Sequence, residues 1–177
     1  KALPPNIDVK AVNGGIQYEF SKTNYKFNPR KGNELNLATT VGIKTIKKSN
    51  AIINIKDPSY NYSSLYDSVK LRSYQWRIRL DAAHYFPLGK SATFKTAIRA
   101  GLYNSPSIFR NELFQIGGYK LLRGFDEESI YASAYTVFTA EYRYLISLNS
   151  YLFGFADIGF SNSRYQLVNT KNQFTGV

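Results

Sequence analysis

The sequence contains no cysteine and only one histidine, His84, among its 177 residues. The lack of cysteine excludes disulfides, thiolate nucleophiles and cysteine metal sites. No Ser/His/Asp set, metal-ligand cluster or glycine-rich phosphate loop is visible. We therefore expect no enzymatic activity, no cofactor and no metal. His84 falls on an apolar, aromatic-ended face, which favours a packed or interfacial role over catalysis.

Long apolar runs are also missing. No segment approaches the ~18 consecutive apolar residues of a spanning helix, so a membrane role would have to use strands or a surface contact. The first residues, Lys1-Ala2-Leu3-Pro4-Pro5, lack the apolar region of a secretory signal. We interpret the chain as mature, trimmed or, preferably, an internal fragment.

Acidic residues are few: 12 Asp and Glu stand against 23 Lys and Arg, a net charge of +11. Such a balance is also found in proteins that bind nucleic acids or anionic membranes. The basic residues are scattered through strand-like segments, apart from the short run at 44–48, and form no stripe or tail. This distribution predicts no nucleic-acid partner.

Aromatic residues are abundant, with 15 Tyr and 12 Phe, and favour strands over helices. The clearest strand pattern runs from Tyr74 to Phe86, where apolar and polar residues alternate over a length that exceeds most soluble strands. Aromatic residues end the apolar face, as at the two interfaces of a bilayer. The opposite face carries Arg77, Arg79 and Asp81 and is expected to line a wet interior.

Five further alternating segments bring the predicted strands to six. They cover residues 16–20, 35–44, 94–103, 138–148 and 151–160. Their polar faces carry Lys95, Arg99, Glu141, Arg143 and Asp157. Turns at 29–32 and 87–90 are short, whereas the connections at about 48–68 and 104–133 are long. Short turns that alternate with long loops are typical of outer-membrane barrels.

The pattern predicts an all-β fold, an antiparallel up-and-down transmembrane β-barrel. We expect a lead-in segment at 1–13 and a barrel region at 14–177, with a long loop at about 104–133. The alternative is a soluble β-sandwich or lipocalin-like barrel, whose strands also alternate. Its inward face should be apolar, which the charges opposite the aromatic rows disfavour.

The second long connection contains a motif that ends in Leu122-Arg123-Gly124-Phe125. It resembles the sixth-loop signature of the outer-membrane protein assembly factor and two-partner-secretion transporter superfamily, the relatives of BamA, TamA, FhaC and the organellar Sam and Toc barrels. The resemblance implies that the loop folds into the lumen and docks its tip on the inner wall. Gly117 and Gly118, which precede the tip, can be read simply as a turn.

A second resemblance is the F-x-D-x-G motif at Phe155, Asp157 and Gly159. The family precedent is a contact between the loop arginine and this aspartate, which strand parity places on the lumen face. A guanidinium can bind a carboxylate bidentately. Glu141 and Arg143 resemble the family's E-x-R pattern and would extend this network. The segment at 27–32 resembles the family's F-x-P-x-x-G hairpin.

The resemblance implies part of a sixteen-stranded barrel, preceded in the family by POTRA domains. At ~10 residues per spanning strand, this chain holds seven or eight strands. The implied function is insertion of β-barrel proteins into the bacterial outer membrane or translocation of polypeptides across it. Its partners would be outer-membrane lipid and lipopolysaccharide, unfolded barrel or secreted clients, and periplasmic accessory proteins.

Three alternatives stay open, the first of them within the superfamily that the motifs resemble. One is a two-partner-secretion pore that exports a dedicated protein, and another is a passive anion-preferring porin lined by Arg77, Arg79, Lys95 and Arg99. The third is a soluble basic β-domain that binds nucleic acid. The loop acids Asp57, Asp67 and 126–128 are expected to form solvated surface, with Asp126 as an alternative orienter of the loop tip.

Overall fold

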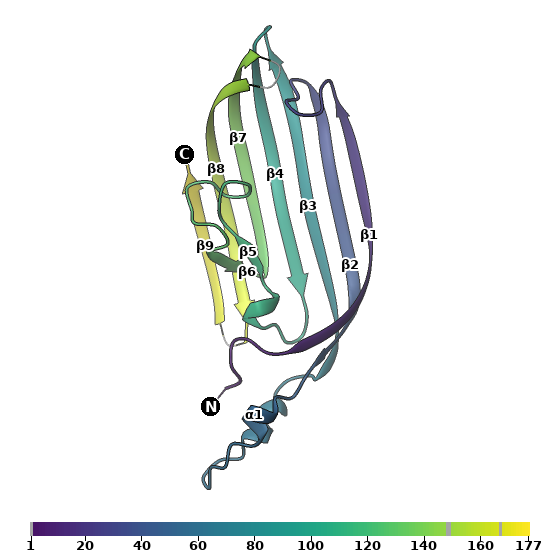
Figure 1. The fold of residues 1–177 in the computed structure, drawn as a ribbon, viewed down its shortest axis with the longest axis vertical. Helices are drawn as coiled ribbons and strands as arrows, with labels where there is room; N and C mark the ends of the chain where they lie inside the picture. Colours follow the sequence, from purple (N-terminus) through teal and green to yellow (C-terminus); the bar gives the residue numbers. More distant parts are fainter. Residues whose placement is uncertain (1, 148–149, 167) are drawn as a thin grey trace.

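The computed structural model describes residues 2–147, 150–166 and 168–177. Its main sheet has seven antiparallel strands arranged in chain order, so that each long strand pairs with the next long strand (Figure 1). The strands are β1 (Val9–Thr23), β2 (Gly32–Ile46), β3 (Arg72–Leu88), β4 (Ala92–Asn104), β7 (Ala134–Ser147), β8 (Ser150–Tyr165) and β9 (Val168–Gly176). The predicted all-β, up-and-down architecture is confirmed. The sheet is open, with β1 and β9 at its edges.

The remaining elements are short. Strands β5 (Phe114–Ile116) and β6 (Ile130–Ala132) form a separate two-stranded sheet within the long loop. Helix α1 (Asn50–Ile53) and the 3-10 turn η1 (Tyr62–Tyr66) lie in the connection between β2 and β3, and the 3-10 turn η2 (Arg110–Glu112) begins the long loop. Among the described residues, no helix has the length and apolar character needed to cross a membrane.

The strand register gives the sheet one apolar face. Phe86 pairs with Phe94, which pairs with Tyr142, so three aromatic residues lie side by side near one end of the sheet. Tyr74 and Trp76 lie on the same face toward the opposite end of β3. Aromatic rows near both ends of an apolar face are typical of strands that cross a bilayer. His84 is on this face too, with its ring centroid 4.0 Å from that of Phe86.

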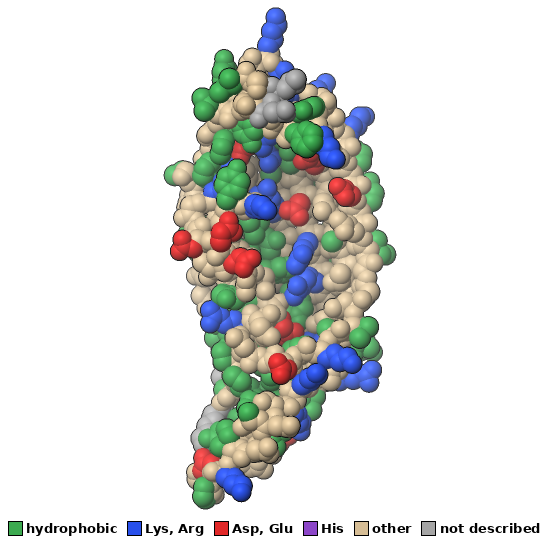
Figure 2. Space-filling model, in the orientation of Figure 1, with side chains coloured by type: hydrophobic (Ala, Val, Ile, Leu, Met, Phe, Trp, Pro, Cys, Tyr) green, Lys and Arg blue, Asp and Glu red, His purple; other side chains and the backbone are tan. Residues whose placement is uncertain are grey.

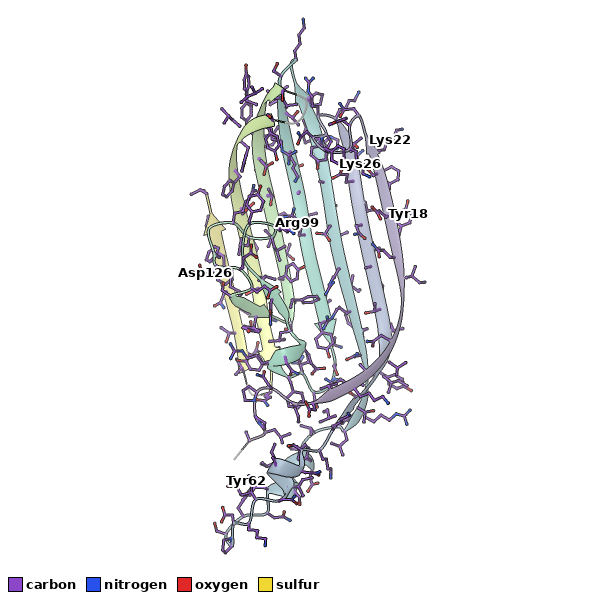
Figure 3. All side chains as sticks on the ribbon, in the orientation of Figure 1. Tyr18, Lys22, Lys26, Tyr62, Arg99 and Asp126 are labelled. Atoms are coloured by element: carbon purple, nitrogen blue, oxygen red, sulfur yellow. The ribbon has the colours of Figure 1, made fainter. Side chains whose placement is uncertain are left out.

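The opposite face is charged and carries the long loop. Figure 2 shows Lys, Arg, Asp and Glu side chains gathered on it, and Figure 3 marks Arg99 near the middle of β4. Arg99 lies 3.5 Å from Asp81 on the neighbouring strand. Arg77, Arg79, Lys95, Glu141, Arg143 and Asp157 share this face by register. We call it the lumen face.

Most strands extend beyond the predicted segments, and two differences change the predicted organisation. Strand β1 begins at Val9, so residues 9–13 belong to the sheet and the predicted lead-in of 1–13 is too long. The pair Gly14-Gly15 interrupts the apolar alternation there, and glycine has little strand propensity. Strand β9 was not predicted, because Asn169, Lys171 and Gln173 give it no apolar row. Its pairing with β8 defines it instead.

The two ends of the sheet differ in their connections. At one end are the short turns after β1 and β3, and the Arg30 side chain of the first turn donates a hydrogen bond to the Gly89 carbonyl of the second at 2.8 Å. At the other end, the segment 47–71 extends beyond the sheet (Figure 1). An apolar cluster fills this second end, formed by Leu3, Ile7, Ile46, Leu65, Tyr66 and Phe109, and we call it the mouth cluster.

Candidate functional site: an inward loop bound to the barrel wall

The loop of residues 105–133 leaves β4 and returns to β7, and it lies over β7, β8 and β9 (Figure 1). Gly117 and Gly118 make the turn after β5 with φ of 118° and 89°. Backbone hydrogen bonds close the tip, among them those from the Gly118 amide to the Phe125 carbonyl at 3.1 Å and from the Leu122 amide to the Gly118 carbonyl at 3.2 Å. This compact tip places the Arg123 side chain against the wall.

Arg123 binds Asp157 in the predicted bidentate manner. Its Nε donates to Oδ2 of Asp157 at 2.8 Å and its second guanidinium nitrogen to Oδ1 at 2.9 Å. The backbone amide of Arg123 adds a third hydrogen bond to Oδ2 at 3.2 Å. Two parallel N–H···O bonds restrict the orientation of both groups as well as pairing their charges. The loop tip is therefore held at one register on β8.

Two further side chains complete this charge cluster. Glu141 accepts a hydrogen bond from Arg123 and another, 2.5 Å long, from Nε of Arg143. Thr139 donates to Oδ1 of Asp157 at 2.7 Å. Two guanidinium groups thus face two carboxylates, and the charges balance within the cluster. Buried charges are tolerated when they are paired and hydrogen-bonded in this way.

The protonation of Arg123 follows from these contacts. Burial by itself would lower its pKa, but the hydrogen bonds to Asp157 and Glu141 outweigh this effect and raise the pKa above its ordinary value. The guanidinium therefore stays charged.

The other two residues of the strand motif each contact the tip. The Phe155 ring centroid lies 3.8 Å from the guanidinium carbon of Arg123, a cation–π contact. Gly159 lies under Leu122, because a Cβ atom at Gly159 would come within 3.2 Å of the Leu122 side chain. Leu122 is fully buried. In the F-x-D-x-G motif on β8, Phe155 thus stacks on the Arg123 guanidinium and Asp157 binds it, while Gly159 leaves room for the Leu122 side chain.

Strand β9 adds contacts that sequence reasoning missed. The Phe125 ring packs edge-on against Phe174 at a centroid distance of 5.3 Å. Gly176 lies beneath the Arg123 backbone, since a Cβ atom there would come within 2.0 Å of the Arg123 carbonyl oxygen. Phe174 and Gly176 could have been identified from their spacing, because an aromatic residue stands two positions before a glycine in Phe174-Thr175-Gly176. We call the contacts of Leu122, Arg123 and Phe125 with β7, β8 and β9 the tip anchor.

The acid that orients the tip is Glu127 rather than Asp126. Its Oε1 accepts a hydrogen bond from the Tyr119 amide at 3.1 Å. Asp126 contributes its backbone carbonyl, which accepts from the Ser129 hydroxyl at 2.9 Å. Figure 3 marks Asp126 on the part of the loop nearest β9. Glu127 is therefore the loop acid with a defined structural contact at the tip.

The remaining predicted lumen charges lie outside the tip anchor. Arg77 donates a hydrogen bond to the Glu112 carbonyl at 2.7 Å and stacks on Phe114 at 4.9 Å. Arg79 also lies over Phe114, at 5.4 Å, and Lys95 lies over Tyr85, at 5.7 Å. The described residues include no group of three or more His, Cys, Asp or Glu side chains that could hold a metal ion.

These features define a class of protein: a membrane β-barrel wall, apolar outside and charged inside, with an internal loop bound to it by an arginine. The sequence matches the model of the Omp85 superfamily domain over residues 8–176, and the chain belongs to this superfamily. The predicted superfamily is thereby confirmed, and the fold is part of an Omp85-type barrel. No curated protein matches the chain significantly.

Membership supports an outer-membrane location and a role in outer-membrane protein assembly or secretion-type transport in general. The superfamily includes organellar relatives as well as bacterial proteins.

Proposed function

We propose that this chain is the loop-bearing part of a bacterial outer-membrane barrel that inserts β-barrel clients into the membrane or translocates polypeptides across it. The observation that carries the proposal is the Arg123–Asp157–Glu141 cluster, which binds a long internal loop to the wall. Paired, buried charges of this kind hold the loop at one position on the wall, which supports an assembly or transport role in which the loop is a working part of the barrel. The proposal assigns no catalytic chemistry to the chain.

The mechanism rests on strand pairing. An unpaired strand edge in hydrocarbon is costly, because each free backbone group lacks a hydrogen-bond partner there. A client strand would be taken up by β-augmentation at a seam that opens elsewhere in the complete barrel. In this scheme Arg123 holds the loop and stiffens β7 and β8, so that movement is confined to the seam. Lipopolysaccharide would surround the apolar face, and periplasmic accessory proteins would deliver clients.

The test is Arg123→Ala in the full-length barrel. We expect membrane insertion of the barrel to be largely retained and client assembly or secretion to fall, because Asp157 and Glu141 lose their shared cation. Lys120→Ala is the matched control, since it removes an exposed cation from the same loop. Insertion is measured by heat-modifiability in detergent, and client output by a census of outer-membrane and secreted proteins at matched barrel levels. Equal client output from Arg123→Ala and wild type would overturn the proposal.

A passive pore is the second candidate, and the basic lumen residues Arg79, Lys95 and Arg99 favour it. Basic side chains that line a pore attract anions. Anion-selective conductance that falls when Arg99 is neutralised, together with unchanged client output on depletion of the protein, would support the pore. Export of a single protein with normal barrel assembly would instead identify a two-partner-secretion pore.

A further inference from the structure

A second group of buried charges lies at the start of the same loop, around Glu112 in η2. Both carboxylate oxygens of Glu112 accept hydrogen bonds from the Lys44 ammonium on β2, at 2.8 and 2.7 Å. The Tyr103 hydroxyl on β4 donates to Oε1 at 2.8 Å, and the Phe109 amide donates to Oε2 at 3.0 Å. Glu112 thus joins two strands to the first residues of the loop.

The surroundings of this carboxylate are largely buried. The Lys44 side chain has an exposed fraction of 0% and that of Glu112 is 9% exposed. The Lys44 ammonium also donates to the Ser107 carbonyl in the loop and lies 5.8 Å from the Phe109 ring centroid. Arg77 on β3 binds the Glu112 backbone carbonyl. Strands β2, β3 and β4 therefore all contact the loop through one residue, Glu112.

The location of the group separates it from the tip anchor. Lys44, Arg77 and Tyr103 come from β2, β3 and β4, whereas Asp157, Glu141 and Phe174 come from β8, β7 and β9. The stem is also bound to the N-terminal segment, since the Arg110 amide donates to the Pro5 carbonyl at 2.8 Å and the Asn111 side chain to the Ile7 carbonyl at 2.9 Å. The two groups have no residue in common.

Energetics indicate what the buried pair contributes. Replacing a buried ion pair by apolar residues often leaves stability unchanged, so such pairs are weak evidence for stability, and their best-attested role is to fix one arrangement among several. Glu112 has four hydrogen bonds to its carboxylate from three segments, and a shifted stem would leave both Glu112 and Lys44 buried without partners. The observed stem position satisfies all these groups at once.

We propose that Glu112 and Lys44 form a second anchor, the stem anchor, which positions the start of the loop at the mouth of the barrel independently of the tip anchor. Residues 105–116 are then held to β2, β3 and β4 and to the mouth cluster even when the tip is released. Glu112 is a positioning residue. The proposal concerns attachment of the loop and does not depend on which transport function the barrel performs.

The test is hydrogen exchange of backbone amides in the full-length barrel in detergent. The amides of Phe109, Glu112 and Leu113 report on the stem, because they are bonded within it, and those of Gly118, Leu122 and Arg123 report on the tip. We expect Glu112→Gln to speed exchange in the stem about 100-fold and leave the tip unchanged, because the Lys44 ammonium would stay buried without its partner. Arg123→Ala should do the reverse. Glu128→Gln, an exposed acid in the same loop, is the matched control.

Double variants separate the proposal from a general loosening of the protein. Lys44→Met combined with Glu112→Gln should speed stem exchange no more than either single change, because both remove the same ion pair. Glu112→Gln combined with Arg123→Ala should speed stem exchange as much as Glu112→Gln alone and tip exchange as much as Arg123→Ala alone, as independent sites do. If either single change speeds exchange throughout residues 106–126, or if Glu112→Gln leaves the stem unaffected, the two-anchor proposal is wrong. If Glu112→Gln fails to fold, Tyr103→Phe probes the same stem with a smaller change.

Discussion

The tip and the stem of the long loop are both bound to the wall through buried ion pairs, but they differ in how their residues lie in the sequence. The tip anchor joins two short motifs, 122–125 and 155–159, each of which is recognisable by itself. The stem anchor joins Lys44 to Glu112, which are 68 positions apart and belong to no motif. The tip contacts could be recognised in the sequence because several of them lie within two short motifs. The stem pair joins two distant residues, so no sequence motif identifies it.

The largest effect is expected from Asp157→Asn, which would weaken the binding of the loop tip to the wall and leave the stem anchor intact. The amide keeps the shape of the side chain but removes the charge that Arg123 and Thr139 bind, and Glu141 retains part of the pairing. We expect the opening free energy of residues 118–126 to fall by about 3 kcal/mol, the lower end for a broken buried pair. Residue-level hydrogen exchange measures it.

Asp81→Asn is the control for this prediction. Asp81 faces the same lumen but is exposed, 3.5 Å from Arg99, so its loss should change the opening free energy by less than about 1 kcal/mol. Equal effects of Asp157→Asn and Asp81→Asn would show that the tip cluster contributes no more than a surface pair.

A steric change should loosen the tip without altering any charge. Gly159→Val would place a branched side chain where Leu122 packs, since even a Cβ atom comes within 3.2 Å of it. Overpacking of this kind costs about 1–3 kcal/mol. We expect cysteines introduced at Phe125 and Phe174 to crosslink more slowly in the Gly159→Val background.

Gly154→Val is the control on the same strand, because a Cβ atom at Gly154 meets nothing within 4 Å. In this background the two cysteines should crosslink at the original rate. Crosslinking that is unaffected by Gly159→Val would mean that Leu122 does not hold the tip.

The smallest effect is expected at the stem from Tyr103→Phe, which removes one of the hydrogen bonds to Glu112 and leaves the ion pair. We expect the stem amides to lose about 1 kcal/mol of protection, the usual net contribution of one hydrogen bond, while the tip amides keep theirs. Tyr135→Phe, whose hydroxyl makes no hydrogen bond within the described residues, is the matched control. A loss of protection at the tip as large as at the stem would argue that the loop moves as one body.

The sequence by itself determined the class of fold and most of the tip anchor. Alternation at a period of two places Asp157, Glu141 and Arg143 on one face of their strands, and this parity depends only on backbone geometry. The pairing of Arg123 with Asp157 was implied by the resemblance of the two motifs to the family. The start of strand β1 could not be predicted from the sequence, because Gly14 and Gly15 carry no side chains that would continue the alternation.

Only the tertiary structure decided the rest. Strand β9 has no apolar row, so its contribution through Phe174 and Gly176 exists only because β8 offers it an edge with which to pair. Likewise, nothing in the sequence pairs Lys44, in the basic run at 44–48, with Glu112, which is 68 positions away. Folding brings them together and removes water from both, and the cost of burying either one alone makes the contact specific.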